Sequence, residues 1–541
     1  MLRRSVRVWA STVLAFALAA CAAPEISHDG ARAPAPAEIE ARVQRGDAEA
    51  ACAALLHTEV GGGVINGAHH IAQGAAYGEG AAAALHLQAP ADFCRVTATL
   101  HPVANSEIQV EVWLPDSWNR KFLAVGGGGF SGGLASASAS LRPALGGGYV
   151  AAATDVGHPE SYGAAWALNQ PERITDWAHR GNHLTAVFAR ALISAYYSQP
   201  LQRAYFQGCS NGGRDALMEA RRYPDDYDGI IAGAPAANWT AMAASFVDSF
   251  RTLYATPGAA NLPSKVGLIG NAVRAQCDAQ DGVSDGIIND PRACAFDPAR
   301  LQCTAGDAPT CLTAAEVAGL RRVYAGAHLR NGVSVYPGFS VGGEDIPENA
   351  LGWRNSGNDG AGALGQEFFR NMVFSDAHWS DAQFDFDRDY AVARQRLGPV
   401  VDAVDPDISA FVRRGGKLIL FHGWADGLIP PEATLRYYQS VQQRIGAATS
   451  AHVRLFMAPG MGHCFSGPGP NNFDMLSEID RWSETGTAPD RVIATKYDND
   501  LMAMLGAPAH ALRTRPLCAW PKRAHYNGSG SSDDAANFSC R

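Results

Sequence analysis

Two features that would place a protein in a membrane or on nucleic acid are missing from this 541-residue sequence. After the N-terminus, no apolar stretch reaches the roughly 20 residues that a membrane-spanning helix needs. The chain has no basic patch or run, and its formal net charge is −9, so we do not expect nucleic acid as a partner. Internal repeats are absent too. The chain is instead 47% hydrophobic, which together with its length predicts a large core and about two domains.

Two pairs of adjacent residues, far apart in the chain, carry the strongest signal. Cys209 and Ser210 stand together in Gly-Cys-Ser-Asn-Gly, and His463 and Cys464 stand together in Gly-His-Cys. A fold that brings Ser210 within hydrogen-bond reach of His463 also brings the two cysteines close enough for a disulfide. The alternative for Cys209 is a free nucleophilic thiol, but Cys464 offers it a partner. The pairs therefore predict a serine hydrolase whose nucleophile and base loops are joined covalently.

The surroundings of Ser210 fit a nucleophile elbow, which is a sharp turn between a strand and a helix. Residues 203–207 read as a short buried strand, and residues 213–223 have a helical pattern of apolar positions. Glycines on both sides of the serine allow the strained backbone of this turn, and the N-terminus of the helix favours developing negative charge. An ordinary surface turn is the alternative, because a chain with 57 glycines matches so short a pattern by chance. The strand before and the helix after favour catalysis.

The acid and the base of a triad are expected after the nucleophile in chain order. Asp426 follows the apolar strand predicted over 416–421, at the carboxyl end where catalytic residues of parallel sheets gather. A second predicted strand, 453–457, leads to His463. His422 competes for the role of base, but it precedes Asp426 directly after the strand, so we interpret it as a residue that packs or supports the loop. The predicted triad is Ser210, Asp426 and His463.

A glycine-rich segment supplies a candidate oxyanion hole. The predicted strand 122–125 runs into Gly-Gly-Gly-Gly-Phe-Ser-Gly-Gly at 126–133, a loop whose backbone N–H groups can approach a substrate oxygen. Hydrolases of this architecture take a second donor from the residue after the nucleophile, here Asn211. A phosphate-binding loop is the alternative, but the segment lacks the Gly-Lys-Ser/Thr ending of a P-loop, and no helical pattern follows it directly.

The N-terminus has the form of a bacterial lipoprotein signal. A positive start and a short apolar segment lead to Leu-Ala-Ala-Cys, which ends at Cys21, the residue expected to be acylated. Residues 1–21 are therefore predicted as a signal peptide and 22–44 as a flexible tether. Of the 11 cysteines, Cys21 is the odd one, and the others can pair, which suggests an oxidising compartment. We expect an exported protein, periplasmic or secreted or anchored to the outer membrane by its lipid, with no other membrane contact.

An acidic loop in the middle of the chain has the composition of a cation site. The segment 277–287 crowds three carboxylates, Asp278, Asp281 and Asp285, between turn-forming glycines, and Ca²⁺ prefers such hard oxygen donors. It is not an EF-hand, because the EF-hand spacing and its distal Glu are absent. The alternative is a solvated loop rich in Asx turns. Like charges held close by flanking cysteines would repel without a cation, so we favour calcium.

Four motifs together resemble the tannase and feruloyl esterase family. They are G-C-S-N-G-G-R at 208–214, Y-P-D-D-Y-D-G-I-I-A-G-A-P at 223–235, H-G-W-A-D at 422–426 and G-M-G-H-C at 460–464, and their spacing also matches. The resemblance covers about residues 45–541. It implies an α/β-hydrolase domain built from 45–240 and 401–541, with a large lid domain, 241–400, inserted between the two parts and carrying the calcium loop.

The resemblance also implies roles for individual residues. It supports the backbone N–H groups of Gly129 and Asn211 as the oxyanion donors. It implies a structural Ca²⁺ ion held by the carboxylates of Asp278, Asp281 and Asp285 and by the backbone carbonyls of Val283 and Ile287. Together with proximity along the chain, it pairs the cysteines as Cys52–Cys94, Cys209–Cys464, Cys277–Cys294, Cys303–Cys311 and Cys518–Cys540.

The substrate is less well determined. Phe368, Phe369 and Phe374 could stack on an aromatic acyl group, or they could equally be core residues of the lid. Terephthalate-monoester hydrolases of this family clamp a free carboxylate with a lid arginine, for which Arg370 is the nearest candidate. Its surroundings resemble ordinary feruloyl esterases instead, as does Ile429. We therefore predict a small aromatic ester of hydroxycinnamic or gallic acid as substrate, with mono(2-hydroxyethyl) terephthalate as the alternative.

Two other classes of protein remain as alternatives. A serine peptidase would use the same triad, but nothing in the sequence marks a peptide-binding groove. A non-catalytic binding lipoprotein would tolerate loss of a triad residue, yet Ser210, Asp426 and His463 are all present. The sequence leaves the alcohol part of the substrate and the oligomeric state open.

Overall fold

The structure is a computed structural model, and it describes residues 46–77, 87–158, 163–259, 261–346 and 360–541. The predicted signal peptide, the tether and Cys21 lie outside these residues, so those expectations remain predictions. Within the described part of the chain, no helix is both long and apolar enough to cross a membrane.

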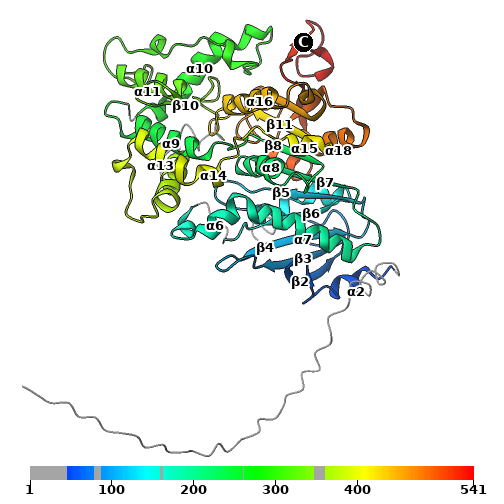
Figure 1. Cartoon of the computed structure of the whole chain (residues 1–541). Helices are drawn as coiled ribbons and strands as arrows, with labels where there is room; N and C mark the ends of the chain where they lie inside the picture. Colours follow the sequence, from blue (N-terminus) through cyan, green and yellow to red (C-terminus); the bar gives the residue numbers. More distant parts are fainter. Residues whose placement is uncertain (1–45, 78–86, 159–162, 260, 347–359) are drawn as a thin grey trace, which may run out of the picture.

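A ten-stranded mixed sheet forms the centre of the molecule (Figure 1). Its strands lie in the order β1-β2-β3-β4-β6-β5-β7-β8-β11-β12. The strands from β1 to β4 pair antiparallel, as do β4 and β6, whereas β6, β5, β7, β8, β11 and β12 run parallel. Their bounds are β1 (Glu59–Val60), β2 (Gly63–Ile71), β3 (Phe93–Leu100), β4 (Ile108–Pro115), β5 (Lys121–Val125), β6 (Val150–Thr154), β7 (Arg203–Cys209), β8 (Gly229–Gly233), β11 (Lys417–Gly423) and β12 (Val453–Ala458). Smaller two-stranded ribbons pair β9 (Ala327–His328) with β10 (Ser334–Tyr336), β13 (Arg491–Tyr497) with β14 (Ala511–Cys518), and β15 (Ala524–Tyr526) with β16 (Phe538–Cys540).

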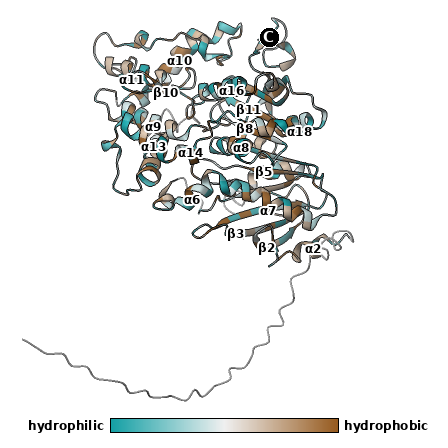
Figure 2. Cartoon of the chain, viewed as in Figure 1, coloured by the Kyte–Doolittle hydropathy of each residue, from teal (hydrophilic) through white to brown (hydrophobic). Residues whose placement is uncertain are grey.

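Helices cover both faces of this sheet. One face packs against α2 (Ala48–Ala53), α7 (Gly181–Tyr196), α8 (Asn211–Arg222), α15 (Ser409–Arg413) and α16 (Pro431–Ile445). The opposite face packs against α4 (Ala137–Ser140), α5 (Arg142–Gly146) and α18 (Met475–Thr485). Parallel strands are therefore buried on both sides, and β6 and β8 are buried along their whole length. Figure 2 shows brown residues gathered along the strands and mixed colours on the helices, as expected for amphipathic helices on a buried sheet. Shorter helices are α6 (Pro171–Thr175), α17 (Thr449–His452) and α19 (Asp500–Met504).

A helical lid is inserted between two neighbouring strands. β8 and β11 pair directly, with Gly229 opposite Lys417, although the whole lid lies between them in sequence. The lid lies at the upper left of Figure 1, in green to yellow. Its helices are α9 (Trp239–Phe250), α10 (Val266–Cys277), α11 (Ala314–Ala325), α12 (Ala361–Glu367), α13 (Phe386–Arg396) and α14 (Gly398–Val401). This is the predicted α/β-hydrolase arrangement with an inserted lid.

Candidate active site

Ser210 occupies a strained turn between β7 and α8. Its backbone has φ 64° and ψ −121°, a region that costs a residue with a side chain about 1–3 kcal/mol. The turn also requires close packing of its glycines, because a Cβ at Gly208 would lie 2.3 Å from the carbonyl oxygen of Gly212. Strand, strained serine and helix together form a nucleophile elbow, which presents the serine hydroxyl at the carboxyl edge of the sheet.

Asp426 lies where β11 ends, and His463 follows β12. One Asp426 oxygen, Oδ1, accepts from the backbone N–H groups of Leu428 (2.8 Å) and Ile429 (2.9 Å), and Oδ2 accepts from His463 Nδ1 at 2.7 Å. Burial raises the pKa of the Asp426 carboxyl, but the charges and hydrogen bonds of His463 and His422 outweigh it and hold the pKa well below its usual range. An ionised carboxylate only accepts, so His463 carries its proton on Nδ1, and Nε2 is the basic nitrogen.

His422 is bonded to the loop that carries Asp426. It is fully buried, and its Nε2 lies 3.1 Å from Asp426 Oδ2 and 3.0 Å from the carbonyl oxygen of Ile429. Both partners are acceptors, so Nε2 carries a proton that is directed at the acid loop. Its Nδ1 lies 2.7 Å from the hydroxyl of Thr434. This placement agrees with the interpretation of His422 as a supporting residue, while the part played by Thr434 had no signal in the sequence.

The structure contains a disulfide between Cys209 and Cys464, whose Cα atoms lie 5.9 Å apart although 255 positions separate them in sequence. It joins the residue before Ser210 to the residue after His463. The other four predicted pairs are also present, namely Cys52–Cys94, Cys277–Cys294, Cys303–Cys311 and Cys518–Cys540. The two loops that carry Ser210 and His463 are thus covalently joined.

The glycine-rich loop after β5 lies against the start of α8. The carbonyl oxygen of Gly127 accepts a hydrogen bond from Gly212 N at 2.7 Å, and Gly126 N donates to Gln207 O at 3.0 Å. Gly129 has a positive φ of 59°, and Asn211 is the first residue of α8. The loop and the helix N-terminus therefore meet beside Ser210, where an oxyanion hole needs its two N–H donors.

Comparison with known proteins identifies the family. A family model described as tannase and feruloyl esterase matches residues 94–541. The chain belongs to the tannase and feruloyl esterase family. It is 38% identical to an uncharacterized esterase of Xanthomonas campestris pv. campestris, over 93% of each chain. It is 31% identical to the mono(2-hydroxyethyl) terephthalate hydrolase of Piscinibacter sakaiensis, over 80% of this chain and 81% of that one. The crystal structure of feruloyl esterase B from Aspergillus oryzae superposes with a TM-score of 0.80 and 26% identity, covering 94% of this chain and 100% of that one.

This tannase and feruloyl esterase family member is accordingly a carboxylic-ester hydrolase of the serine type with an α/β-hydrolase fold.

Its acidic loop, 277–287, lies in the lid and folds mainly through its own turns. Asp278 accepts from the backbone N–H groups of Asp285 and Gly286, and Asp281 accepts from Val283 N. Asp285 also pairs with the buried Arg515 at 2.8 Å. Among the described residues, no three Asp, Glu, His or Cys side chains are grouped as metal ligands, so the donor set here would need the predicted carbonyls of Val283 and Ile287.

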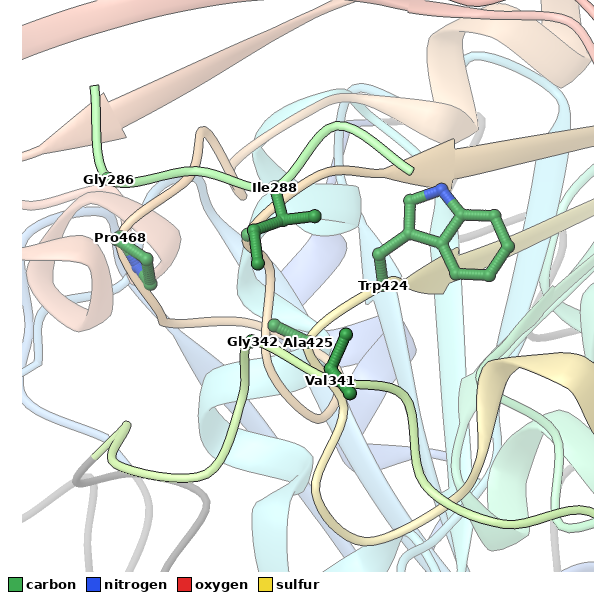
Figure 3. Close-up of a pocket in the computed structure, with 8 residues that line it drawn as sticks. Gly286, Ile288, Val341, Gly342, Trp424, Ala425 and Pro468 are labelled. Atoms are coloured by element: carbon green, nitrogen blue, oxygen red, sulfur yellow. The ribbon is translucent and has the colours of Figure 1, made fainter. Parts of the chain in front are cut away.

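The end of the acidic loop lies beside the loops that carry Asp426 and His463. A cavity of about 10 Å³, room for one water molecule, separates Gly286 and Ile288 from Trp424 and Ala425 of the acid loop (Figure 3). Gly460 and Pro468 of the histidine loop also line it. Nearby, the Arg292 guanidinium lies over the rings of Trp424 (5.0 Å) and Trp520 (4.6 Å). These contacts between the lid and the loop of Asp426 join residues more than a hundred positions apart. No local pattern in the amino-acid sequence predicts them.

The four predicted substrate-contact residues lie in the lid. Phe368 and Phe369 are fully buried, and Phe369 stacks on Trp379 with centroids 5.6 Å apart. Phe374 also stacks on Trp379, at 5.8 Å. Arg370 pairs with Glu367 at 2.7 Å and donates to the carbonyl oxygen of Trp379. The two buried phenylalanines therefore belong to the lid core. This was one of the two predictions for this segment, the other being contact with an aromatic acyl group. Leu364 of α12 lies instead beside the glycine-rich loop, with its Cδ2 3.9 Å from the position of a Cβ on Gly129.

Proposed function

We propose that this esterase hydrolyses esters of aromatic carboxylic acids through a Ser210–His463–Asp426 triad. The observation that carries the proposal is the hydrogen bond from His463 Nδ1 to Asp426 Oδ2, with Ser210 in a nucleophile elbow and a disulfide joining the two loops. This set of residues supports acyl transfer, because one base is oriented by a buried carboxylate and one hydroxyl is presented on a strained turn.

The proposed reaction has two stages. The Ser210 hydroxyl attacks the ester carbonyl while His463 Nε2 takes its proton, and the N–H groups of Gly129 and Asn211 stabilise the resulting oxyanion. The C–O bond to the alcohol then breaks, His463 protonates the leaving alkoxide, and an acyl ester of Ser210 remains. A water molecule, deprotonated by His463, attacks this ester. The bond to the Ser210 oxygen then breaks, His463 returns the proton to that oxygen, and the acid is released. Asp426 keeps the imidazole oriented and stabilises its positive charge throughout.

For the acyl group we propose hydroxycinnamic or gallic acid. The family match and the likeness to a feruloyl esterase support this choice. The hydrolase of mono(2-hydroxyethyl) terephthalate is also a relative, so that monoester is the second candidate. Its free carboxylate would need a cation, and Arg370 is already held by Glu367 and by the carbonyl oxygen of Trp379. This pairing favours an acyl group without a second carboxylate.

We also propose that Asp278, Asp281, Asp285 and the carbonyls of Val283 and Ile287 hold a structural Ca²⁺ ion. Their donors are all hard oxygen atoms, which suits calcium, and no step of the reaction involves the ion. We further propose export to an oxidising compartment, with lipid attachment at Cys21 as the finer prediction. The five disulfides of the described chain support export, because such bonds persist where thiols are not kept reduced.

The test is a substrate panel with wild type and Ser210→Ala. Methyl ferulate, methyl gallate, mono(2-hydroxyethyl) terephthalate and a peptide anilide are compared by kcat/KM. We expect one of the first two esters to be the best substrate, and Ser210→Ala to lower its turnover by at least about 10⁴-fold with unchanged melting. Preference for the terephthalate monoester would show that the acyl group is terephthalate rather than hydroxycinnamate or gallate. Preference for the peptide would indicate a peptidase. Near wild-type turnover by Ser210→Ala would refute the triad itself.

A further inference from the structure

Arg214, on the helix α8 that follows Ser210, is a buried charge whose donors are all hydrogen-bonded. Its side chain is fully buried. A guanidinium has five N–H donors, and here each has an acceptor. Nε donates to Asn211 Oδ1 (2.7 Å), Nη1 donates to the carbonyl oxygens of Ala178 (3.0 Å) and Val401 (3.3 Å), and Nη2 donates to Trp177 O (3.0 Å) and Asp215 Oδ1 (2.7 Å).

On one side, this arginine holds the oxyanion hole. Asn211, whose backbone N–H is a proposed oxyanion donor, is fixed by Arg214 through its side-chain oxygen, while its amide nitrogen lies 3.4 Å from Asp215 Oδ2. The same Asp215 oxygen closely approaches the glycine loop, because a Cβ at Gly126 would lie only 3.2 Å from it. The arginine and Asp215 thus form one buried unit that fixes both halves of the hole.

On the other side, Arg214 reaches the root of the lid, where the chain enters and leaves it. Val401, which accepts from Arg214, is the last residue of α14, and Trp239, whose ring centroid lies 5.8 Å from the guanidinium, is the first of α9. The two crossings are bonded to each other, since Ala403 N donates to Ala237 O at 2.7 Å. A single side chain therefore contacts both ends of the lid.

An aromatic cluster completes the connection. Arg214 stacks on Trp177 with 4.2 Å from its Cζ to the ring centroid. Phe130, which directly follows Gly129, packs on the same Trp177 (5.8 Å) and on Trp239 (5.4 Å). The glycine loop, the lid root and the nucleophile helix consequently share one packed unit with Arg214 in its centre.

We propose that Arg214 is a positioning residue that couples the placement of the lid to the geometry of the oxyanion hole. The inference rests on the proposed function, because it assumes that Asn211 and Gly129 supply the oxyanion donors. Lysine cannot replace the arginine, since an ammonium group has three donors around a point charge. It cannot reach the five acceptors that surround the planar guanidinium. Loss of the fork leaves Asn211 and the lid root free to shift, and displacements of about 1 Å in such sites cost on the order of 100-fold in rate.

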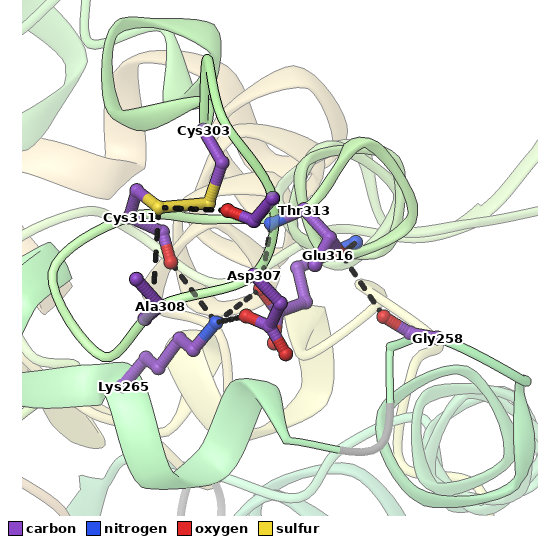
Figure 4. Close-up of a disulfide and its surroundings, with 9 residues drawn as sticks. Gly258, Lys265, Cys303, Asp307, Ala308, Cys311, Thr313 and Glu316 are labelled. Atoms are coloured by element: carbon purple, nitrogen blue, oxygen red, sulfur yellow. Dashed lines mark hydrogen bonds and ion pairs between the residues drawn. A yellow bond between two sulfur atoms is a disulfide. The ribbon is translucent and has the colours of Figure 1, made fainter.

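If Arg214 had only a structural role, its replacement would lower stability and leave the chemistry unchanged. The test therefore needs a matched control, in which another buried ion pair is broken. Lys265 in the lid provides it (Figure 4). It is buried and pairs with Glu316 at 2.8 Å and Asp307 at 2.7 Å, beside the disulfide Cys303–Cys311. Lys265→Met leaves the buried carboxylate of Glu316 without its cation. Arg214→Lys similarly weakens the pairing of Asp215. The partners of Lys265, however, lie outside the proposed oxyanion hole.

The experiment compares wild type, Arg214→Lys, Asn211→Ala and Lys265→Met in the full exported enzyme. Asn211→Ala removes only one bond of Arg214 and keeps the backbone N–H, so it remains informative if Arg214→Lys folds poorly. Each variant is melted, its active sites are counted by titration with a phosphonate, and kcat and KM are measured with p-nitrophenyl acetate and methyl ferulate. Affinity for phenylboronic acid, which forms a tetrahedral adduct with the serine, is compared with affinity for ferulate.

We expect Arg214→Lys and Asn211→Ala to lower kcat per active site by about 10- to 100-fold on both esters, with KM changed less than about threefold. Boronate binding should weaken by a similar factor, and ferulate binding should hardly change. Lys265→Met should melt lower and keep kcat within about twofold. Equal kcat in Arg214→Lys and Lys265→Met, or boronate and ferulate affinities that fall together, would overturn the positioning role. Wild type that fails to react with the phosphonate would instead contradict the proposed serine chemistry.

Discussion

The disulfide Cys209–Cys464 should matter more for turnover than its effect on stability suggests. It closes a loop of 255 positions, for which the chain-entropy model gives a stabilisation of about 5 kcal/mol. It also links the backbones of Ser210 and His463 directly, since each cysteine is the immediate neighbour of one of them. Replacing both cysteines by alanine removes the link, and about 1 Å of drift between nucleophile and base would cost on the order of 100-fold in kcat.

The matched control is the disulfide Cys52–Cys94. Both of its cysteines are fully buried, it joins α2 to β3, and its loop of 42 positions corresponds to about 4 kcal/mol in the same model. It lies at the antiparallel end of the sheet, away from the carboxyl edge that carries the triad. The pair Cys518–Cys540 is a less suitable control, because it packs against Val283 of the acidic loop.

The assay is kcat and KM on methyl ferulate, with urea unfolding of the same preparations. We expect the Cys209→Ala/Cys464→Ala variant to lose about 10- to 100-fold in kcat with little change in KM, and the Cys52→Ala/Cys94→Ala variant to lose stability alone. Peptide mapping of the native enzyme should recover Cys209 linked to Cys464. Full turnover in the first double variant, measured where it is folded, would refute the idea that the disulfide fixes the catalytic geometry.

Three further outcomes follow from the lid and its root. A calcium chelator should lower the melting temperature and added Ca²⁺ should restore it, whereas an unchanged melt with no calcium by elemental analysis would reject the site. Asp402, which follows α14 at the lid root, accepts from the backbone N–H and the hydroxyl of Thr240. Burial raises the pKa of its carboxyl to about 6, so its contribution to stability is complete below about pH 4 and is lost as the pH rises through about 6. The difference in free energy of unfolding between wild type and Asp402→Asn should therefore change by up to about 3 kcal/mol between about pH 4 and pH 6 in urea melts, and parallel curves would contradict this. Arg370→Ala should leave the ratio of kcat/KM between methyl ferulate and the terephthalate monoester within about threefold, while a selective loss of the monoester would show that the arginine binds its carboxylate.

The sequence predicts the catalytic loops because their signals are local. The strand expected over 203–207 and the helix over 213–223 appear as β7 and α8, and Asp426 lies where the strand over 416–421 ends. The pairing of Cys209 with Cys464 could be inferred from adjacency alone, since each cysteine directly neighbours a catalytic candidate. These features need only a short window of residues and the order of elements along the chain.

The contacts that join the lid to the site could not be predicted in this way. Arg214 meets Trp177 and Val401, which lie 37 and 187 positions away, and no periodicity indicates such a contact. The sequence did not decide whether Phe368 and Phe369 contact the substrate or pack in the lid core, because an aromatic pair without clear periodicity does not indicate which side is buried. In the structure both side chains are fully buried. Only tertiary packing decides both questions.

The topology explains why the lid root lies so close to the chemistry. The lid leaves after the carboxyl end of β8, on the edge that also carries Ser210 and Asp426. The returning chain passes beside this exit at Ala403 and only then runs through α15 to the start of β11, the parallel neighbour of β8. The two crossings therefore lie side by side at the carboxyl edge. The bond between Ala403 N and Ala237 O joins them, and Arg214 lies against both. A substitution in the outer lid around α10 and α11 can therefore alter stability without reaching the site. A substitution at the root should move the lid and the oxyanion hole together, so turnover should fall alike on p-nitrophenyl acetate and on methyl ferulate.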